Sequence, residues 1–142
     1  MDNEKKSSLA EFSRRAMQRL QDRKAPKFQA LYIPSLDMRL KIRSLTPSEI
    51  SECLGIDDSE DKNRGDKYAI YLAAVEPNLK ETAKEIMAAE VGLPPDQRTI
   101  LEPLDVLNIF PMSEITGIAM KVMELSGVVS SKKVTVVEEL KN

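Results

Sequence analysis

Residues 28–54, FQALYIPSLDMRLKIRSLTPSEISECL, decide the fold of this chain. Apolar and basic side chains alternate along residues 38–43, so a strand there has one apolar and one basic face. Residues 28–33 alternate less regularly, and residues 34–37 between the two runs have the composition of a turn. The stretch therefore predicts a two-stranded antiparallel hairpin. Because a lone hairpin is only marginally stable in water, helices have to cover its apolar face.

A helix start follows the hairpin directly, at Thr46-Pro47-Ser48-Glu49. The Thr46 hydroxyl can accept a hydrogen bond from a free N–H of the first turn, and Pro47 suits the first helical position. Glu49 stands where a capping box places its carboxylate. The spacing predicts a short helix that begins here and ends near Gly55.

The N-terminal segment is basic: residues 1–45 contain eleven Lys/Arg and five Asp/Glu, although the whole chain has a net charge of −2. Residues 1–7 are expected to be frayed, and a capping-box pattern at Ser8 predicts a helix from there to about Asp22. Its narrow apolar stripe suggests a helix that docks on a partner, and a peripheral core helix is the equal alternative. The candidate contact residues on this helix are Leu9, Phe12, Arg15, Arg19 and Leu20.

Helical periodicity continues to Gly127, with predicted helix ends at Glu76, before Pro77, and near Gly92. A short helix is expected from Glu102 and a last one over residues 112–126. The predicted fold class is α+β, mostly α-helical, with about five to six helices packed around one N-terminal antiparallel hairpin. The predicted organisation is a basic helix and linker (1–27), a globular domain (28–127) and a flexible tail (128–142).

The tail contains one β-prone run, Val134-Thr135-Val136-Val137. We expect most of the tail to be mobile, since it has little apolar surface to offset the entropy of ordering. Val134, Val136 and Val137 are candidate partner-binding residues, because they can pair as a strand on the hairpin edge of this molecule or of a neighbour.

The residues that most catalytic and metal sites need are missing. The chain has no histidine and a single cysteine, Cys53, so the usual zinc sites and a Cys–His pair are excluded. Its five glycines are scattered and form no phosphate-binding loop. We therefore predict a protein that is not an enzyme, with no cofactor, no metal, no catalytic residue and no small-molecule substrate. A polar N-terminus and the lack of a long apolar run lead us to expect a cytoplasmic protein without membrane contact.

The order of these elements resembles one known family. A basic helix precedes a hairpin and the junction Leu45-Thr46-Pro47-Ser48-Glu49-Ile50, and two helices surround Ala74-Val75-Glu76-Pro77-Asn78-Leu79. Glu102-Pro103-Leu104-Asp105-Val106-Leu107 follows, and Phe110-Pro111 leads into a helix that ends Leu125-Ser126-Gly127. Over about residues 8–127 the chain resembles the XkdN-like tail assembly chaperones of phages and prophages of Gram-positive bacteria.

The resemblance implies a binding protein. Such chaperones keep the tape measure protein of the tail soluble and help to recruit tail tube subunits, and they leave before the virion is finished. The implied partners are therefore the tape measure protein and the tail tube protein. Self-association is a separate candidate interaction, which follows from the β-prone run of the tail. The implied location is the host cytoplasm, and the protein is not expected in the mature particle.

Two alternatives remain open. A structural tail component, such as a connector or completion protein, would stay in the purified particle. A small nucleic-acid-binding regulatory module is compatible with a basic hairpin face beside helices. The net negative charge and the low aromatic content argue against nucleic acid as a partner.

Overall fold

The structure is a computed structural model that describes residues 2–57, 59–130 and 134–140. The fold is α+β and mostly helical, with one antiparallel sheet near the N-terminus, as the sequence predicts. The elements of the described residues, with η for a 3₁₀ helix, are in chain order α1 (Asp2–Asp22), β1 (Phe28–Ile33), β2 (Met38–Arg43), α2 (Pro47–Leu54), α3 (Arg64–Ala73), β3 (Ala74–Glu76), α4 (Leu79–Ala89), η1 (Pro95–Gln97), η2 (Pro103–Ile109) and α5 (Met112–Leu125).

The predicted hairpin is present, and β1 and β2 pair over their full lengths. Leu31 lies opposite Leu40, and the inward side chains Ile33, Leu40 and Ile42 belong to the core. Met38 has the spacing of the apolar face, but it adjoins the turn and is mostly exposed. The turn residue Asp37 has a left-handed φ of 49° and accepts a hydrogen bond from the Tyr32 hydroxyl.

The sheet has a third strand that was not predicted. The helix expected to end at Glu76 ends at Ala73, and Ala74–Glu76 pairs antiparallel with β2 as β3. Pro77 disfavours the helical conformation for the residue before it, so an extended approach to Pro77 is locally favourable. The free edge of β2 then supplies backbone partners that the sequence pattern alone does not show.

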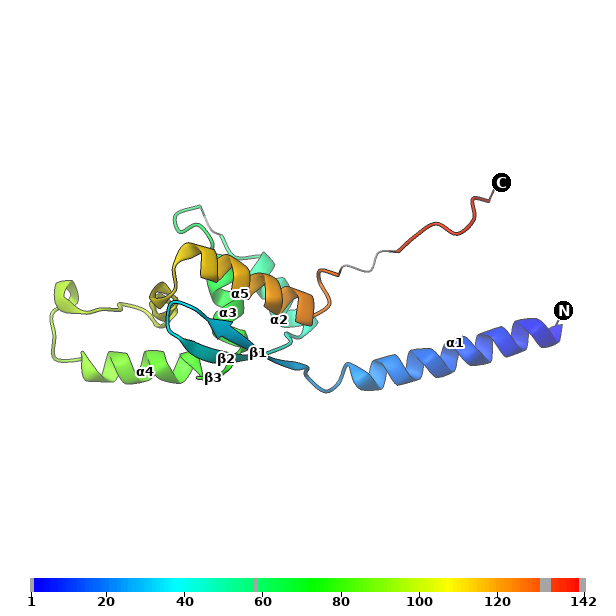
Figure 1. Cartoon of the computed structure of the whole chain (residues 1–142), viewed down its shortest axis with the longest axis horizontal. Coiled ribbons are helices and arrows are strands. Elements are labelled where there is room, and N and C mark those ends of the chain that lie inside the picture. The colour runs from blue at the N-terminus through cyan, green and yellow to red at the C-terminus, as the bar shows by residue number, and fades with distance from the viewer. Residues whose placement is uncertain (1, 58, 131–133, 141–142) are drawn as a thin grey trace.

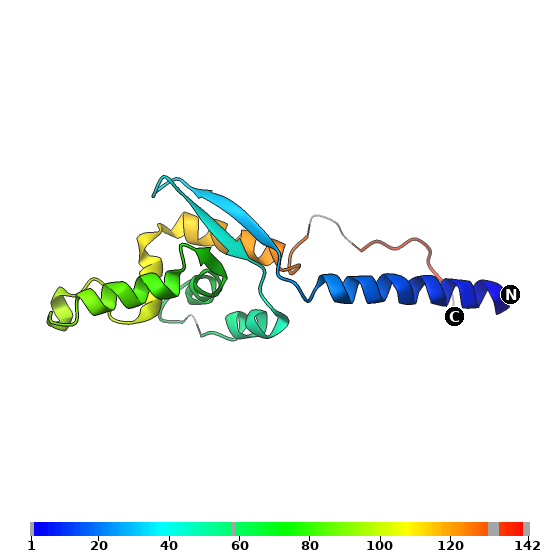
Figure 2. The same ribbon diagram turned by 90° about the horizontal axis from the view of Figure 1, so that it is seen from below.

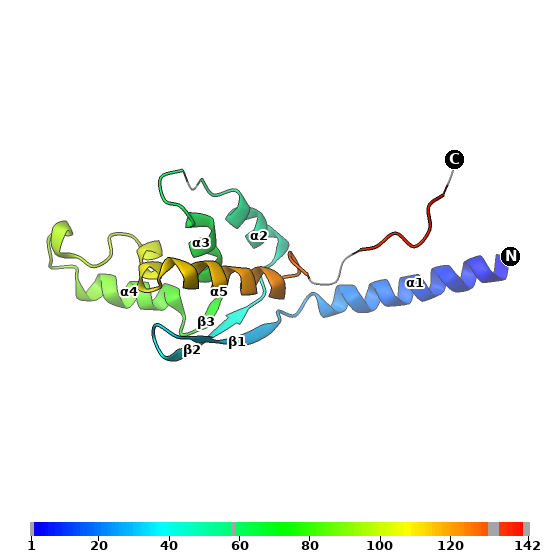
Figure 3. The same cartoon turned by 45° about the horizontal axis from the view of Figure 1, so that its top comes forward.

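The core lies between the sheet and the helices. Helix α5 packs against α3 and also contacts β1 and β2, while α4 packs on η2 (Figure 3). The buried side chains of α5 are Ile115, Ile118, Ala119 and Val122. The helix predicted from Glu102 is present as a 3₁₀ helix, and Leu104, Leu107 and Phe110 are buried there. Helices α2 and α3 approach closely at Gly65, where a Cβ atom would lie 2.8 Å from the carbonyl oxygen of Cys53.

Helix α1 projects from this body at the end opposite α4 (Figure 1). It begins at Asp2, so the expected helix start at Ser8 is wrong. Residues 2–7, expected to be frayed, are helical, and residue 1 lies outside the described residues. Glu4 in the first turn suits the positive end of the helix dipole, and the run from Asn3 to Ser8 contains no Pro or Gly. The capping pattern at Ser8 therefore lies inside a continuous helix.

The chain leaves the body after α5. Gly127 has a φ of 81°, a left-handed conformation that ends the helix where the sequence predicts. Residues 134–140 form neither helix nor strand, and their side chains are exposed. Among the described helices none is by itself long and apolar enough to cross a membrane, and only η2 and α5 taken together, bent by 112°, meet that test.

Candidate partner-binding surface

The apolar stripe of α1 is mostly exposed. Leu9, Phe12 and Leu20 are 67%, 71% and 66% exposed. Their spacing of three and eight residues places them on one side of the helix, with Ala16 between them. Figure 2 shows that α1 extends beyond the sheet and the other helices over most of its length. The stripe is therefore available to another molecule.

Charged and polar side chains flank the stripe. Arg15 forms an ion pair with Glu11 at 2.8 Å, one helical turn away, and Gln18 donates to Asp22 at 2.9 Å. Both members of the ion pair are exposed, so its contribution to stability is small. The candidate residues Arg15 and Arg19 thus lie on the same helix as the apolar stripe, where they can contact an acidic partner.

A groove of about 780 Å³ opens where α1 joins the body. It lies between the end of α1, the linker 23–27, the junction from β2 to α2 and the end of α5. Its cations outnumber its anions, since Asp22 is the only acidic lining residue among those described. The cationic lining residues are Arg19, Arg23, Lys24, Lys27 and Arg43. The groove was not predicted, although the basic linker was visible in the sequence.

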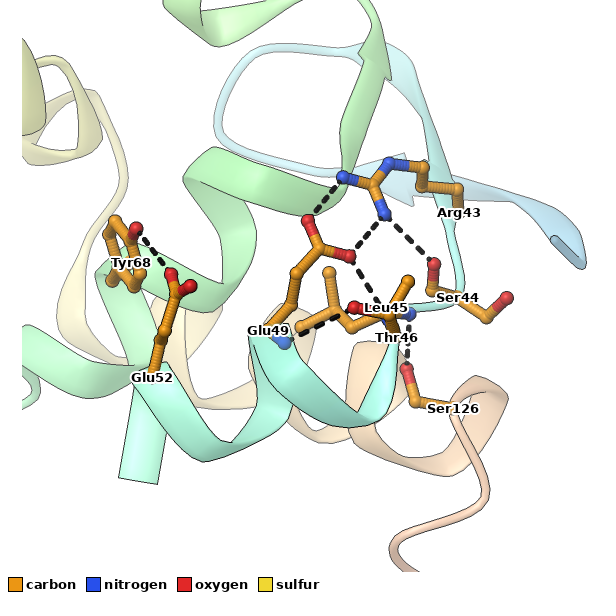
Figure 4. A network of polar contacts seen from close by, with 8 residues as sticks. All are labelled: Arg43, Ser44, Leu45, Thr46, Glu49, Glu52, Tyr68 and Ser126. Carbon is orange, nitrogen blue, oxygen red and sulfur yellow. Dashed lines mark hydrogen bonds and ion pairs between the residues drawn. The ribbon is translucent and has the colours of Figure 1, made fainter. Parts of the chain in front are cut away.

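The wall of this groove is fixed by the predicted capping box. The Thr46 hydroxyl accepts from the Glu49 N–H at 3.2 Å, and the Glu49 carboxylate accepts from the Thr46 N–H at 3.0 Å (Figure 4). Arg43 binds both oxygens of the same carboxylate, at 2.8 and 2.7 Å. The Arg43 guanidinium is the main reason that the pKa of Glu49 is lowered to about 2. The last residue of the hairpin is thereby attached to the first turn of α2.

A second bond attaches this junction to the last helix. The Leu45 N–H donates to the Ser126 hydroxyl at 2.8 Å, and that hydroxyl donates to the Val122 carbonyl at 2.6 Å. Ser126 is buried, so these bonds satisfy polar groups that have little access to water. The start of the tail, at Gly127, therefore has a defined position beside the groove.

The tail candidates do not join α1 in one site. Val134, Val136 and Val137 are almost fully exposed and lie in a segment that runs separately from α1, on the same side of the body (Figures 1 and 3). The structure thus presents two separate candidate surfaces, the α1 stripe and the tail. Residues 131–133 of the predicted tail lie outside the described residues.

The single cysteine, Cys53, is a buried and free thiol. Cys53 is buried on α2, and burial raises the pKa of its thiol to about 11, so the thiol is neutral at physiological pH. In the described part of the chain, no three His, Cys, Asp or Glu side chains come together as a metal site would require.

Comparison with known proteins gives no relative. No protein-family model, no curated protein sequence and no solved structure matches this chain.

Proposed function

We propose that this protein is a tail assembly chaperone of a phage, a prophage or a phage-tail-like particle. Its client is the tape measure protein, which it holds in solution in the host cytoplasm while tail tube subunits are recruited. The single observation that carries the proposal is the uncovered apolar stripe of α1, a helix that extends from the body into solvent. A stable body that presents one long amphipathic helix is suited to hold a helical client.

The chemistry of α1 indicates what it binds. Leu9, Phe12 and Leu20 offer apolar contacts at helical spacing, which match the apolar face of another amphipathic helix. Arg15 and Arg19 flank these contacts and favour a client with acidic residues beside its own apolar face. The element order of the body also supports the proposal, because the resemblance rests on that order: a hairpin and a capped helix, followed by α3, α4, η2 and α5.

Co-expression with the tape measure protein tests the proposal. The client should be soluble with this protein and insoluble without it. Phe12→Ser should leave the circular dichroism spectrum unchanged and abolish rescue of the client. The matched control is Gln18→Ser on the opposite side of α1, which should keep full rescue because Gln18 lies about 180° from Leu9 on the helix.

Two outcomes would support the alternatives. Recovery of the protein in purified particles would identify a structural tail component. A shift of nucleic acid in a gel, weakened steeply by salt, would identify a nucleic-acid-binding module that uses the basic helix. A client that stays soluble with the Phe12→Ser variant would show that the stripe of α1 is not the contact surface.

A further inference from the structure

Strand β1 has a free edge. The order β1-β2-β3 makes β1 an outer strand in the described part of the chain. At its start, Lys27 and Ser44 form a hydrogen-bonded pair: the Ser44 N–H donates to the Lys27 carbonyl at 2.8 Å, and the Lys27 N–H donates to the Ser44 hydroxyl. Bonded and non-bonded pairs alternate along an antiparallel ladder.

The register then identifies the free backbone groups. Gln29 and Leu31 are the next bonded positions, so Phe28, Ala30 and Tyr32 direct their N–H and C=O groups away from β2. Natural edge strands are usually protected by Lys, Pro or a bulge. The sequence of β1, FQALYI, has no charge and no proline, and the irregularity of the sheet lies between β2 and β3. This edge is a ready template for one more strand.

The tail contains a segment that fits such an edge. All four residues of Val134-Thr135-Val136-Val137 are β-branched, which favours a strand, and they are exposed and extended from the body. Main-chain pairing with an exposed edge is a common way for a short peptide to bind.

Charge selects the direction of pairing. In an antiparallel arrangement Glu138 and Glu139 come to the start of β1, beside the cationic groove that contains Lys24 and Lys27. In a parallel arrangement the two carboxylates come to the turn 34–37, whose only charged residue is Asp37. At the start of β1 the two glutamates meet several cations, whereas at the turn they meet Asp37 and one nearby cation, Arg39. The charges therefore favour the antiparallel direction.

The position of the tail favours a second molecule over the same one. Residues 134–140 lead away from the body and from their own β1, on the side where α1 projects (Figures 1 and 3). Their side chains are exposed, so Val134-Thr135-Val136-Val137 is available to the β1 edge of another copy.

We propose that residues 134–137 of one chain add as an antiparallel strand to β1 of a second copy, with Glu138 and Glu139 at the partner's groove. If the exchange is reciprocal, the two copies form a closed two-fold dimer.

Light scattering coupled to size-exclusion chromatography of the purified full-length chain tests this directly. Wild type should show twice the chain mass of 15.9 kDa at high concentration and dissociate on dilution. Ala30→Pro removes an N–H on the free edge and Val136→Pro breaks the tail strand, so each should be monomeric. The controls Ala30→Ser and Val136→Thr keep the N–H and should remain dimeric.

Mixing the two proline variants distinguishes a tail that binds β1 of another copy from a tail that binds β1 of its own chain. The Ala30→Pro chain keeps its tail and the Val136→Pro chain keeps its edge, so the mixture should form a weaker heterodimer through one tail only. A wild type that is monomeric at every concentration would overturn the proposal, and so would a dimer that survives both proline variants. Since no client is present, either result is independent of the chaperone proposal.

Discussion

Helices α1 and α5 both have an apolar stripe at helical spacing, and the two stripes have opposite environments. On α5, Ile115, Ile118 and Val122 are buried against α3 and the sheet. On α1, Leu9 and Phe12 are mostly exposed. The pattern that predicts an amphipathic helix says that one face avoids water, but it does not say whether the cover comes from the same chain. The comparison separates residues that hold the fold from residues available for binding.

The largest difference in stability is expected when an aspartate is placed in the buried core and, for comparison, on the exposed stripe of α1. Ile42 is fully buried on β2, so Ile42→Asp buries an unpaired carboxylate and should cost more than about 4 kcal/mol, which abolishes soluble folding. Phe12→Asp on α1 should leave the circular dichroism spectrum and the melting temperature unchanged. An Ile42→Asp variant that melts like wild type would contradict the assignment of the hairpin to the core.

Truncation of one apolar side chain on each helix measures the same difference between α5 and α1 with a smaller effect. Val122→Ala in α5 should lower the free energy of unfolding by about 2 kcal/mol, because Val122 is fully buried. Leu20→Ala in α1 should change it by less than about 0.5 kcal/mol. Urea denaturation at equal protein concentration gives both values. Equal losses in the two variants would mean that α1 packs on the body in solution.

The junction between the two regions should be sensitive to acid. The pKa of Glu49 is about 2 in the folded chain and 4.5 at its ordinary value, so the folded state favours the ionised carboxylate. The Arg43–Glu49 pair therefore stabilises the fold fully above pH 4.5, and this contribution is lost as the pH falls toward 2.

The matched variant is Glu49→Gln. It should lower the free energy of unfolding by about 1 kcal/mol at neutral pH, and its own stability should depend less on pH over that acidic window. Denaturant midpoints at a series of pH values test this. A Glu49→Gln variant with the same acid dependence as wild type would show that other carboxylates dominate.

The smallest effect is expected at the tail. Deletion of residues 134–142 should leave the melting temperature unchanged at concentrations where the wild type is monomeric, because residues 134–140 have no packing against the body. Differential scanning calorimetry on the two chains tests it. A clear loss of stability would place the tail in the core and would extend the comparison to a third region.

Local sequence signals predicted the elements whose partners are close in the chain. The hairpin follows from alternation along residues 28–43 and from turn residues between the strands, and the start of α2 follows from Thr46 and Glu49. Helix ends at Gly55 and Gly127 follow for the same reason. In each case the hydrogen bonds that form the element join residues a few positions apart, so their spacing is visible in the sequence.

The features that the sequence did not predict depend mostly on contacts between segments far apart in the chain. β3 exists because β2 has a free edge some thirty residues upstream, which no local pattern at Ala74–Glu76 reveals. The groove combines the end of α1, the linker, the β2–α2 junction and the end of α5. The early start of α1 is different, since there a capping motif at Ser8 was given more weight than the continuous helical propensity of the residues before it.

The sequence by itself determined the hairpin, the capped helix, the amphipathic helices and the lack of histidine-based chemistry, because these depend on residue identity and short spacing. Only the tertiary structure decided which apolar faces are covered. The stripe of α5 is buried because the sheet and α3 meet it, and the stripe of α1 is exposed because that helix extends away from the body. Burial depends on contacts between segments far apart in the chain, and short-range patterns do not specify those contacts.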